Sequence, residues 1–189
     1  MAVKREITPE LVRELIEYCP LTGALTWKSR GPEHFNCSTQ SAEHSAKIWN
    51  SRNAGQPALS TKNGNGYLHG AIFGQTVTAH SVAWVIHHGA WPEHGIDHED
   101  GDRLNNRIKN LRDVPDAENA KNQKRNRRNT SGVTGVSYFH RTKKWVAMIK
   151  GDGKVRNLGY FRTIEEAAAA RKAAEKKYGF HPNHGRVAA

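Results

Sequence analysis

Residues 96–128 read IDHEDGDRLNNRIKNLRDVPDAENAKNQKRNRR, and this stretch decides our interpretation of the fold. Residues 96–98 are predicted as a strand, residues 101–110 as a long loop and residues 111–114 as a second strand, with a helix starting at Pro115 or Asp116. Five of the eight residues from Lys121 to Arg128, at the end of that helix, are basic. The segment therefore predicts a strand, loop, strand and helix unit.

Four polar side chains in this unit suit the hydrolysis of a phosphodiester. That reaction needs a base for the attacking water and a cation for the charge on the phosphate. His98 is a base whose unperturbed pKa lies near neutral pH. Asp97 and Asn119 offer the oxygen ligands that a magnesium-like ion prefers. Asn110 can hydrogen-bond the loop backbone and so fix the ring of His98.

The choice of metal ligand depends on the regularity of the first strand. Neighbouring residues on a regular strand point to opposite faces, yet Asp97 and His98 must both approach one phosphate. A strand end or a bulge would allow this. If the strand is regular, Asp100, two residues after His98, is the rival ligand.

Positive charge is concentrated in the last part of the chain. The 189 residues include 29 Lys and Arg against 18 Asp and Glu, a net charge of +11. Residues 116–189 hold 17 of the basic and 6 of the acidic side chains, so they account for the whole excess. A near-neutral first part joined to a basic end indicates a reactive centre attached to a module that binds phosphates.

Composition also excludes some classes of protein. No apolar run approaches the roughly 18 residues that span a bilayer, which argues against a membrane protein. The two cysteines, Cys19 and Cys37, are too few for a disulfide framework or a CxxC zinc site. The start of the chain has no apolar signal core, so we expect a cytoplasmic protein without a secretion signal.

The first 95 residues read as support for this unit. Thr8 is predicted to cap a helix that runs to about Tyr18. Residues 26–53 are weakly periodic and are predicted as loops with short strands. Residues 66–80 suggest a hairpin with a turn at Gly74, and residues 81–88 a buried helix that Gly89 ends. His80, His87, His88 and His94 are expected in core or surface roles rather than as metal ligands, with His80, just upstream of the unit, as the leading exception that would face the site.

Residues 129–180 predict a three-stranded sheet and one helix. GVSYFHR, KKWVAMIKG and KVRNLGYF read as strands, joined by turns at residues 142–143 and 152–153. Trp145 shares a face with Ala147 and Ile149, and we expect it to pack on the helix. Thr163 and Glu166 form a capping box at the start of that alanine-rich helix. The tail after Phe180 is expected to fray.

The spacing of the candidate residues resembles the HNH homing endonucleases of phages and introns. Asn110 follows His98 by twelve residues, and Asn119 follows Asn110 by nine. In that family the His is the general base, the residue before it binds the metal, the middle Asn braces the loop, and a helix Asn or His completes the metal site. The resemblance implies these roles for His98, Asp97, Asn110 and Asn119, with one Mg²⁺ or Mn²⁺ as the cofactor.

The C-terminal segment resembles the Apetala-two, or ethylene-response-factor, DNA-binding domain. The matching residues are Gly135-Val136, Lys144 to Ile149, Leu158 to Phe161 and the helix from Thr163. The resemblance implies a double-stranded DNA partner, contacted through the exposed face of the sheet and the basic run before it. The candidate DNA-binding residues are Lys121, Lys124, Arg125, Arg127, Arg128, Phe139, Arg141, Lys143, Lys150 and Asn157.

Together these features predict an α+β protein with a ββα-metal nuclease core. The expected parts are an N-terminal region (1–60), the nuclease domain (61–128), the DNA-binding domain (129–180) and a tail (181–189). The expected activity is metal-dependent DNA cleavage to 5′-phosphate and 3′-hydroxyl ends in a phage-infected bacterial cell. One site per chain favours nicking by a monomer, whereas a dimer would cut both strands. The alternative is a DNA-binding regulator with an inactive nuclease fold.

Overall fold

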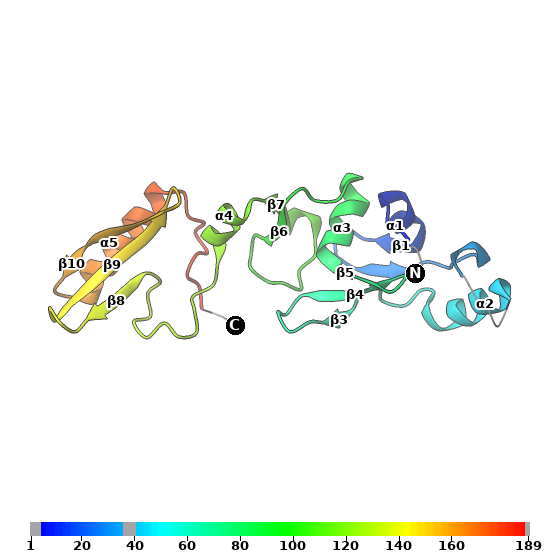
Figure 1. Ribbon diagram of the computed structural model, residues 1–189, viewed down its shortest axis with the longest axis horizontal. Coiled ribbons are helices and arrows are strands. Elements are labelled where there is room, and N and C mark those ends of the chain that lie inside the picture. Colours follow the sequence, from blue (N-terminus) through cyan, green and yellow to red (C-terminus); the bar gives the residue numbers. More distant parts are fainter. Residues whose placement is uncertain (1–4, 36–40, 188–189) are drawn as a thin grey trace. The chain divides into compact units, whose positions relative to one another are not determined.

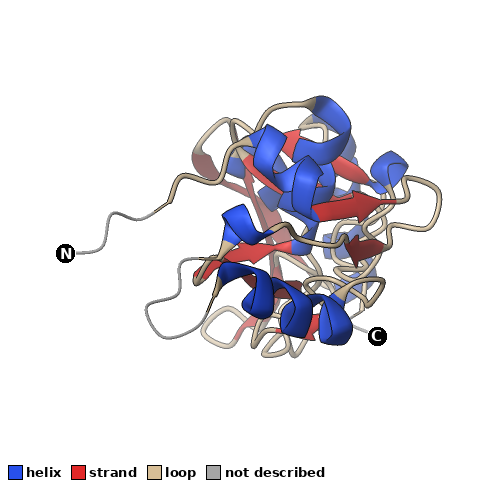
Figure 2. Cartoon of the chain, turned by 90° about the vertical axis from the view of Figure 1, so that its right-hand side faces the viewer, coloured by secondary structure: helices blue, strands red, loops and turns tan. Residues whose placement is uncertain are grey.

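The computed structural model describes residues 5–35 and 41–187 (Figure 1). Cys37 lies outside these residues. The chain divides into two compact units, Met1–Asp113 and Val114–Ala189. The described residues form helices and several small sheets, in line with a mixed α+β fold (Figure 2). No helix among the described residues is long and apolar enough to cross a membrane.

The first unit begins with a short helix and a hairpin. Thr8 caps α1 (Pro9–Leu15), because its side chain accepts a hydrogen bond from the backbone of Leu11. The helix was expected to reach Tyr18, but the chain turns into β1 (Ile16–Tyr18), which pairs antiparallel with β2 (Leu25–Trp27). The backbone of Ile16–Tyr18 therefore finds its hydrogen-bond partners across the hairpin.

Residues 26–53 hold more helix than the sequence indicated. A 3-10 turn, η1 (Pro32–His34), precedes α2 (Ala42–Asn53), which Ser41 caps. The buried residue of α2 is Ala46, so its sequence carries no apolar stripe. The prediction of loops with short strands was wrong here for that reason.

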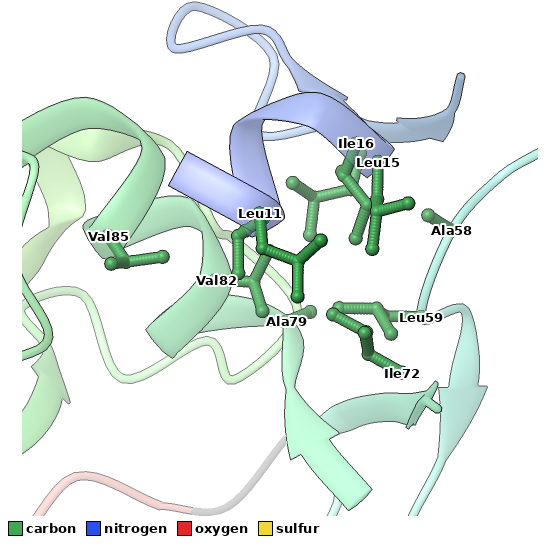
Figure 3. Close-up of a cluster of buried hydrophobic side chains, with 11 residues drawn as sticks. Leu11, Leu15, Ile16, Ala58, Leu59, Ile72, Ala79, Val82 and Val85 are labelled. Carbon is green, nitrogen blue, oxygen red and sulfur yellow. The ribbon is translucent and has the colours of Figure 1, made fainter. Parts of the chain in front are cut away.

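A three-stranded antiparallel sheet and one helix complete the main core. The sheet has the order β3 (Thr61–Lys62), β4 (Leu68–Ile72), β5 (Gln75–Thr78), and α3 (Ala79–His88) follows and ends at the left-handed Gly89. The predicted hairpin and buried helix are therefore confirmed. Figure 3 shows Leu11 and Leu15 of α1 packed with Val82 of α3 and Ile72 of β4. Full burial of each such side chain contributes about 1.5–3 kcal/mol to folding.

Residues 95–114 form a second small sheet. β6 (Gly95–His98) pairs with β7 (Leu111–Val114), and η2 (Ile108–Asn110) lies just before β7. Ile96 and Leu111 pack on Ala83 of α3, which fixes the sheet to the main core. Both strands were predicted from the sequence, and the long loop between them was as well.

The second unit begins with a helix of one turn. α4 (Asp116–Asn119) passes into η3 (Ala120–Asn122). Then β8 (Val136–Phe139), β9 (Lys144–Gly151) and β10 (Lys154–Phe161) form an antiparallel sheet in the order β10-β9-β8. α5 (Ile164–Lys177) starts with the predicted capping box. Trp145 packs with Ala147 of the sheet and Ala167 of α5, as expected.

Residues 181–186 are hydrogen-bonded to the basic run, although the sequence predicted a frayed tail. His181 N donates to Lys121 O at 3.2 Å, Gly185 N to Gln123 O at 2.8 Å, and Arg125 N to Arg186 O at 2.9 Å. The Arg186 guanidinium also donates to Asn122 Oδ1 at 2.8 Å. Because residues 121–125 are bonded in this way to residues 181–186, the basic run packs with the C-terminal part. The nuclease domain was predicted to end at residue 128, whereas the two compact units divide after Asp113.

Candidate active site

Asp97 and His98 occupy the last two positions of β6, and both are buried, with 7% and 3% of their surface exposed. Because β6 ends at His98, the regular alternation of faces need not continue there, and a strand end is one of the two arrangements that would let both side chains approach one phosphate. Arg112, on the paired strand β7, donates from Nη2 to Asp97 Oδ2 at 2.6 Å. This ion pair, which the sequence did not predict, holds the carboxylate in one orientation.

The imidazole of His98 is buried beside the side chain of Asn106. Its Nε2 is 3.1 Å from Asn106 Oδ1, which is buried as well. Burial lowers the pKa of His98, against the hydrogen bond to Asn106 and the charges of Asp100, Asp97 and Asp102, which raise it. The net direction keeps the ring neutral near pH 7, the form that can accept a proton.

Asn110 fastens the loop between β6 and β7. Its Oδ1 accepts from Asp100 N at 2.9 Å, and its Nδ2 donates to Asn105 O at 2.8 Å. Its backbone carbonyl accepts from Glu99 N at 2.9 Å. One side chain therefore ties both ends of the loop, although the direct partner of the His98 ring is Asn106.

Asp100, the rival ligand, is used in the loop itself. Its carboxylate accepts from Asp102 N and from Asn105 Nδ2, both at 2.7 Å. Burial acts to raise the pKa of Asp100. The hydrogen bonds with Asn105, Asp102 and Asn110, together with the charge of His98, outweigh burial, so the pKa is lowered overall. An ionised carboxylate with two donors at these distances braces the loop.

Asn106 is positioned by the N-terminal hairpin. The Tyr18 hydroxyl donates to Asn106 O at 2.7 Å, and Ile108 N donates to Pro20 O at 3.3 Å. Gly23, at φ +79°, lies so close that a Cβ there would be 2.7 Å from the carbonyl carbon of Asn106. A side chain at Gly23 would therefore displace the residue that bonds His98.

Two aromatic residues complete the surroundings of His98. The ring of His80, on α3, meets the ring of His98 edge-on at 5.3 Å, and the ring of Tyr67 lies 5.0 Å from His80 and 5.7 Å from His98. His80 Nε2 is 3.0 Å from Thr78 Oγ1. The sequence singled out His80 by its place in the chain, but nothing in it pointed to Tyr67 or Asn106.

The burial of His80 predicts a pH-dependent stability. Burial and the neighbouring His98 lower the pKa of His80 to about 4, below its ordinary 6.5, so the unfolded chain binds the proton first. The free energy of unfolding should fall by about 3 kcal/mol as the pH drops from about 6.5 to about 4. Urea denaturation of His80→Gln should show a weaker fall than the wild type. His87→Gln, on the exposed side of the same helix, should follow the wild type.

A separate cluster of possible metal ligands lies on α1 and η1. His34 Nε2 is 3.0 Å from Glu14 Oε1 and 3.4 Å from Glu33 Oε1. Within the described part of the chain, no other group of three His, Cys, Asp or Glu side chains converges as closely. Asp97 and His98 are not part of this cluster, which joins η1 to α1.

The remaining predicted site residues belong to the second unit. Asn119, half-buried, is the last residue of α4. Phe139, Lys150 and Asn157 lie on the exposed face of the sheet, opposite the face that packs on α5. Arg141 and Lys143 lie in the turn between β8 and β9, Lys121 lies in η3, and the rest of the basic run follows it as Lys124, Arg125, Arg127 and Arg128.

Tyr160 also lies on the exposed face of the sheet, although simple alternation of residues along β10 places it on the opposite face. A bulge between Asn157 and Gly159 shifts the register of β10, so Tyr160 pairs with Val146 and is 51% exposed. Its ring is 6.1 Å from that of Phe139. Phe161 packs in the core instead.

Comparison with known proteins adds one finding. Residues 77–121 match the family model described as HNH endonuclease, and Asp97, His98, Asn110 and Asn119 all fall inside this range. Neither the curated proteins nor the solved structures gave a match. The segment that contains the buried His98 is thus similar to HNH endonucleases, which supports a nuclease with a DNA substrate at the level of the family.

Proposed function

We propose that this chain is a divalent-metal-dependent DNA endonuclease of the HNH homing type. The observation that carries the proposal is a buried imidazole, His98, held at the end of β6 inside the segment that matches HNH endonucleases. His98 is the general base, and Asn110 keeps the surrounding loop in place.

The surroundings of His98 suit transfer of a proton from water. The depressed pKa keeps the ring neutral until it accepts the proton. The charges of Asp100, Asp97 and Asp102 then favour the imidazolium that forms. Asn106 sets the orientation of the ring, and His80 and Tyr67 pack against it.

The donor atoms fit a hard divalent ion. The buried carboxylate of Asp97, held by Arg112 Nη2 at 2.6 Å, is an oxygen ligand of the kind that Mg²⁺ and Mn²⁺ prefer. In this proposal Asp97 and, by the family resemblance, Asn119 hold the ion. When bound, the ion stabilises the charge on the phosphate and on the departing 3′ oxygen. The ends produced are 5′-phosphate and 3′-hydroxyl, and a monomer nicks.

Conversion of supercoiled plasmid tests the proposed reaction. With Mg²⁺ or Mn²⁺ present, we expect open circles, and EDTA should prevent their formation. Linear product would show that both strands are cut, and it would favour two paired active sites over nicking by a monomer. DNA binding without any conversion would contradict the nuclease and favour a DNA-binding regulator.

The sheet of the second unit is proposed to contact the DNA backbone. Arg141→Ala and Lys150→Ala should each reduce the slope of log affinity against log salt by about 1, because each lost phosphate contact releases one counterion fewer. Lys172→Ala, on α5, should leave the slope unchanged. Fluorescence anisotropy with a labelled duplex at several salt concentrations measures this. Unchanged slopes in both variants would place the DNA elsewhere.

A further inference from the structure

The second unit contains a cavity of about 450 Å³ whose lining includes none of the residues proposed for the cleavage step, although Lys121 and Lys150 are also candidate DNA contacts. It lies along the edge of β9 beyond Ala147, which pairs with Val136, the first residue of β8. The lining residues come from α4, η3, the end of β9, α5 and the C-terminal segment. The volume falls within the roughly 300–1,000 Å³ typical of sites for small ligands.

The walls of this cavity are fixed by hydrogen bonds. The bonds between residues 121–125 and 181–186 hold Lys121 beside Phe180 and His184. Arg171, on α5, is 4% exposed and donates from Nε to Glu175 Oε1 at 2.8 Å and from Nη1 to Met148 O. A pocket built in this way exists before a ligand arrives, which lowers the entropic cost of binding.

The charge on the lining favours an anion. Lys121, Lys150 and Arg171 line the cavity together with Asp152, and Arg171 is paired with Glu175. Among the described residues, neither lysine takes part in an ion pair. The Thr134 hydroxyl, also on the wall, has no hydrogen-bond partner in that part of the chain. Unpaired ammonium groups and a hydroxyl are suitable donors for a phosphate.

The rest of the lining is apolar and includes a fixed aromatic ring. Phe180 packs against His184 at 4.7 Å between ring centroids and lies 5.2 Å from the guanidinium carbon of Arg171. Ala117 and Ala120 add small apolar surfaces. A planar base can stack on a ring held in this way. The combination of cations, a hydroxyl and an aromatic ring therefore matches a nucleotide better than an inorganic anion or an apolar molecule.

We propose that this cavity binds one phosphate-bearing nucleotide, with its phosphate near Lys121 and Lys150 and its base against Phe180. The nucleotide could be free or could be an unpaired end of a DNA strand, and both present the same chemistry. The binding needs neither His98 nor a metal, so it can be tested whether or not the chain cleaves DNA.

Calorimetry with the full chain carrying His98→Ala, in EDTA, tests the proposal. Deoxynucleoside 5′-monophosphates should bind, whereas the nucleosides and inorganic phosphate should bind at least tenfold more weakly. A 5′-phosphorylated single-stranded trinucleotide, compared with the monophosphate, distinguishes a strand end from a free nucleotide as the preferred ligand. Equal affinity for phosphate and nucleotide, or no binding of either nucleotide probe, would overturn the proposal.

Two variants locate the binding. Ala120→Leu fills the cavity without changing its charge and should weaken nucleotide binding at least tenfold, whereas Ala173→Leu, on the exposed side of α5, should not. Phe180→Leu keeps the apolar bulk but removes the aromatic ring, and it should also weaken binding. Thermal denaturation checks that each variant folds. Unchanged affinity in both cavity variants would mean that the nucleotide binds elsewhere.

Discussion

His98→Ala should reduce DNA cleavage by about 10²- to 10⁴-fold, the usual contribution of a general base. Binding to duplex DNA should be kept, because the basic residues proposed for that task belong to the second unit. Single-turnover nicking of plasmid, alongside anisotropy with an uncleaved duplex, separates the two effects.

The control for this variant is another histidine near the same strand. His94 lies just before β6 with 43% of its side chain exposed, 3.7 Å from Asp113. His94→Ala should cleave at the wild-type rate. Because His98 is buried, His98→Gln provides a second inactive variant that keeps a polar side chain for Asn106. Full activity in either His98 variant would refute the assignment of the base.

Asn110→Ala should also slow cleavage markedly, although Asn110 touches no reacting atom in this proposal. The change removes two hydrogen bonds to the loop, from Asp100 N and to Asn105 O. We expect about 2–3 kcal/mol of lost stability from these bonds. Loosening of the loop by about 1 Å should slow cleavage by about 10²-fold. Urea denaturation and single-turnover nicking measure the two losses.

Asn50 offers a matched control for the loss of stability. Its side chain makes the same pair of bonds, accepting from Arg30 N at 2.8 Å and donating to Arg30 O at 2.9 Å, in the same unit but on α2. Asn50→Ala should destabilise the chain by a similar amount and leave the cleavage rate of the folded protein unchanged. If both variants slowed cleavage equally, Asn110 would have no specific role in the site.

Elements with strong local signals were predictable from the sequence. Thr8 with Pro9, and Thr163 with Glu166, marked the starts of two helices, since capping depends on residues that are neighbours in the chain. The strands at 95–98 and 111–114 were also found. The end of α1 was not, because Ile16 continues the apolar pattern of the helix and only its pairing with Trp27 makes it a strand.

The immediate surroundings of His98 were beyond sequence reasoning. Asn105, Asn106 and Asn110 lie in the same polar loop, and their sequence does not distinguish the partner of His98 from the residues that brace the backbone. Tyr67 reaches the site from a loop thirty-one residues earlier. Such contacts depend on the packing of the whole unit and leave no local pattern.

The hydrogen bonds between residues 121–125 and 181–186 have a consequence for biosynthesis. The ribosome makes the N-terminal unit first, and its core contains no residue after Asp113. Residues 121–125, by contrast, lack their partners until residues 181–186 have been translated. Throughout that interval the nascent chain can carry a folded first unit beside a basic run whose backbone is still unpaired.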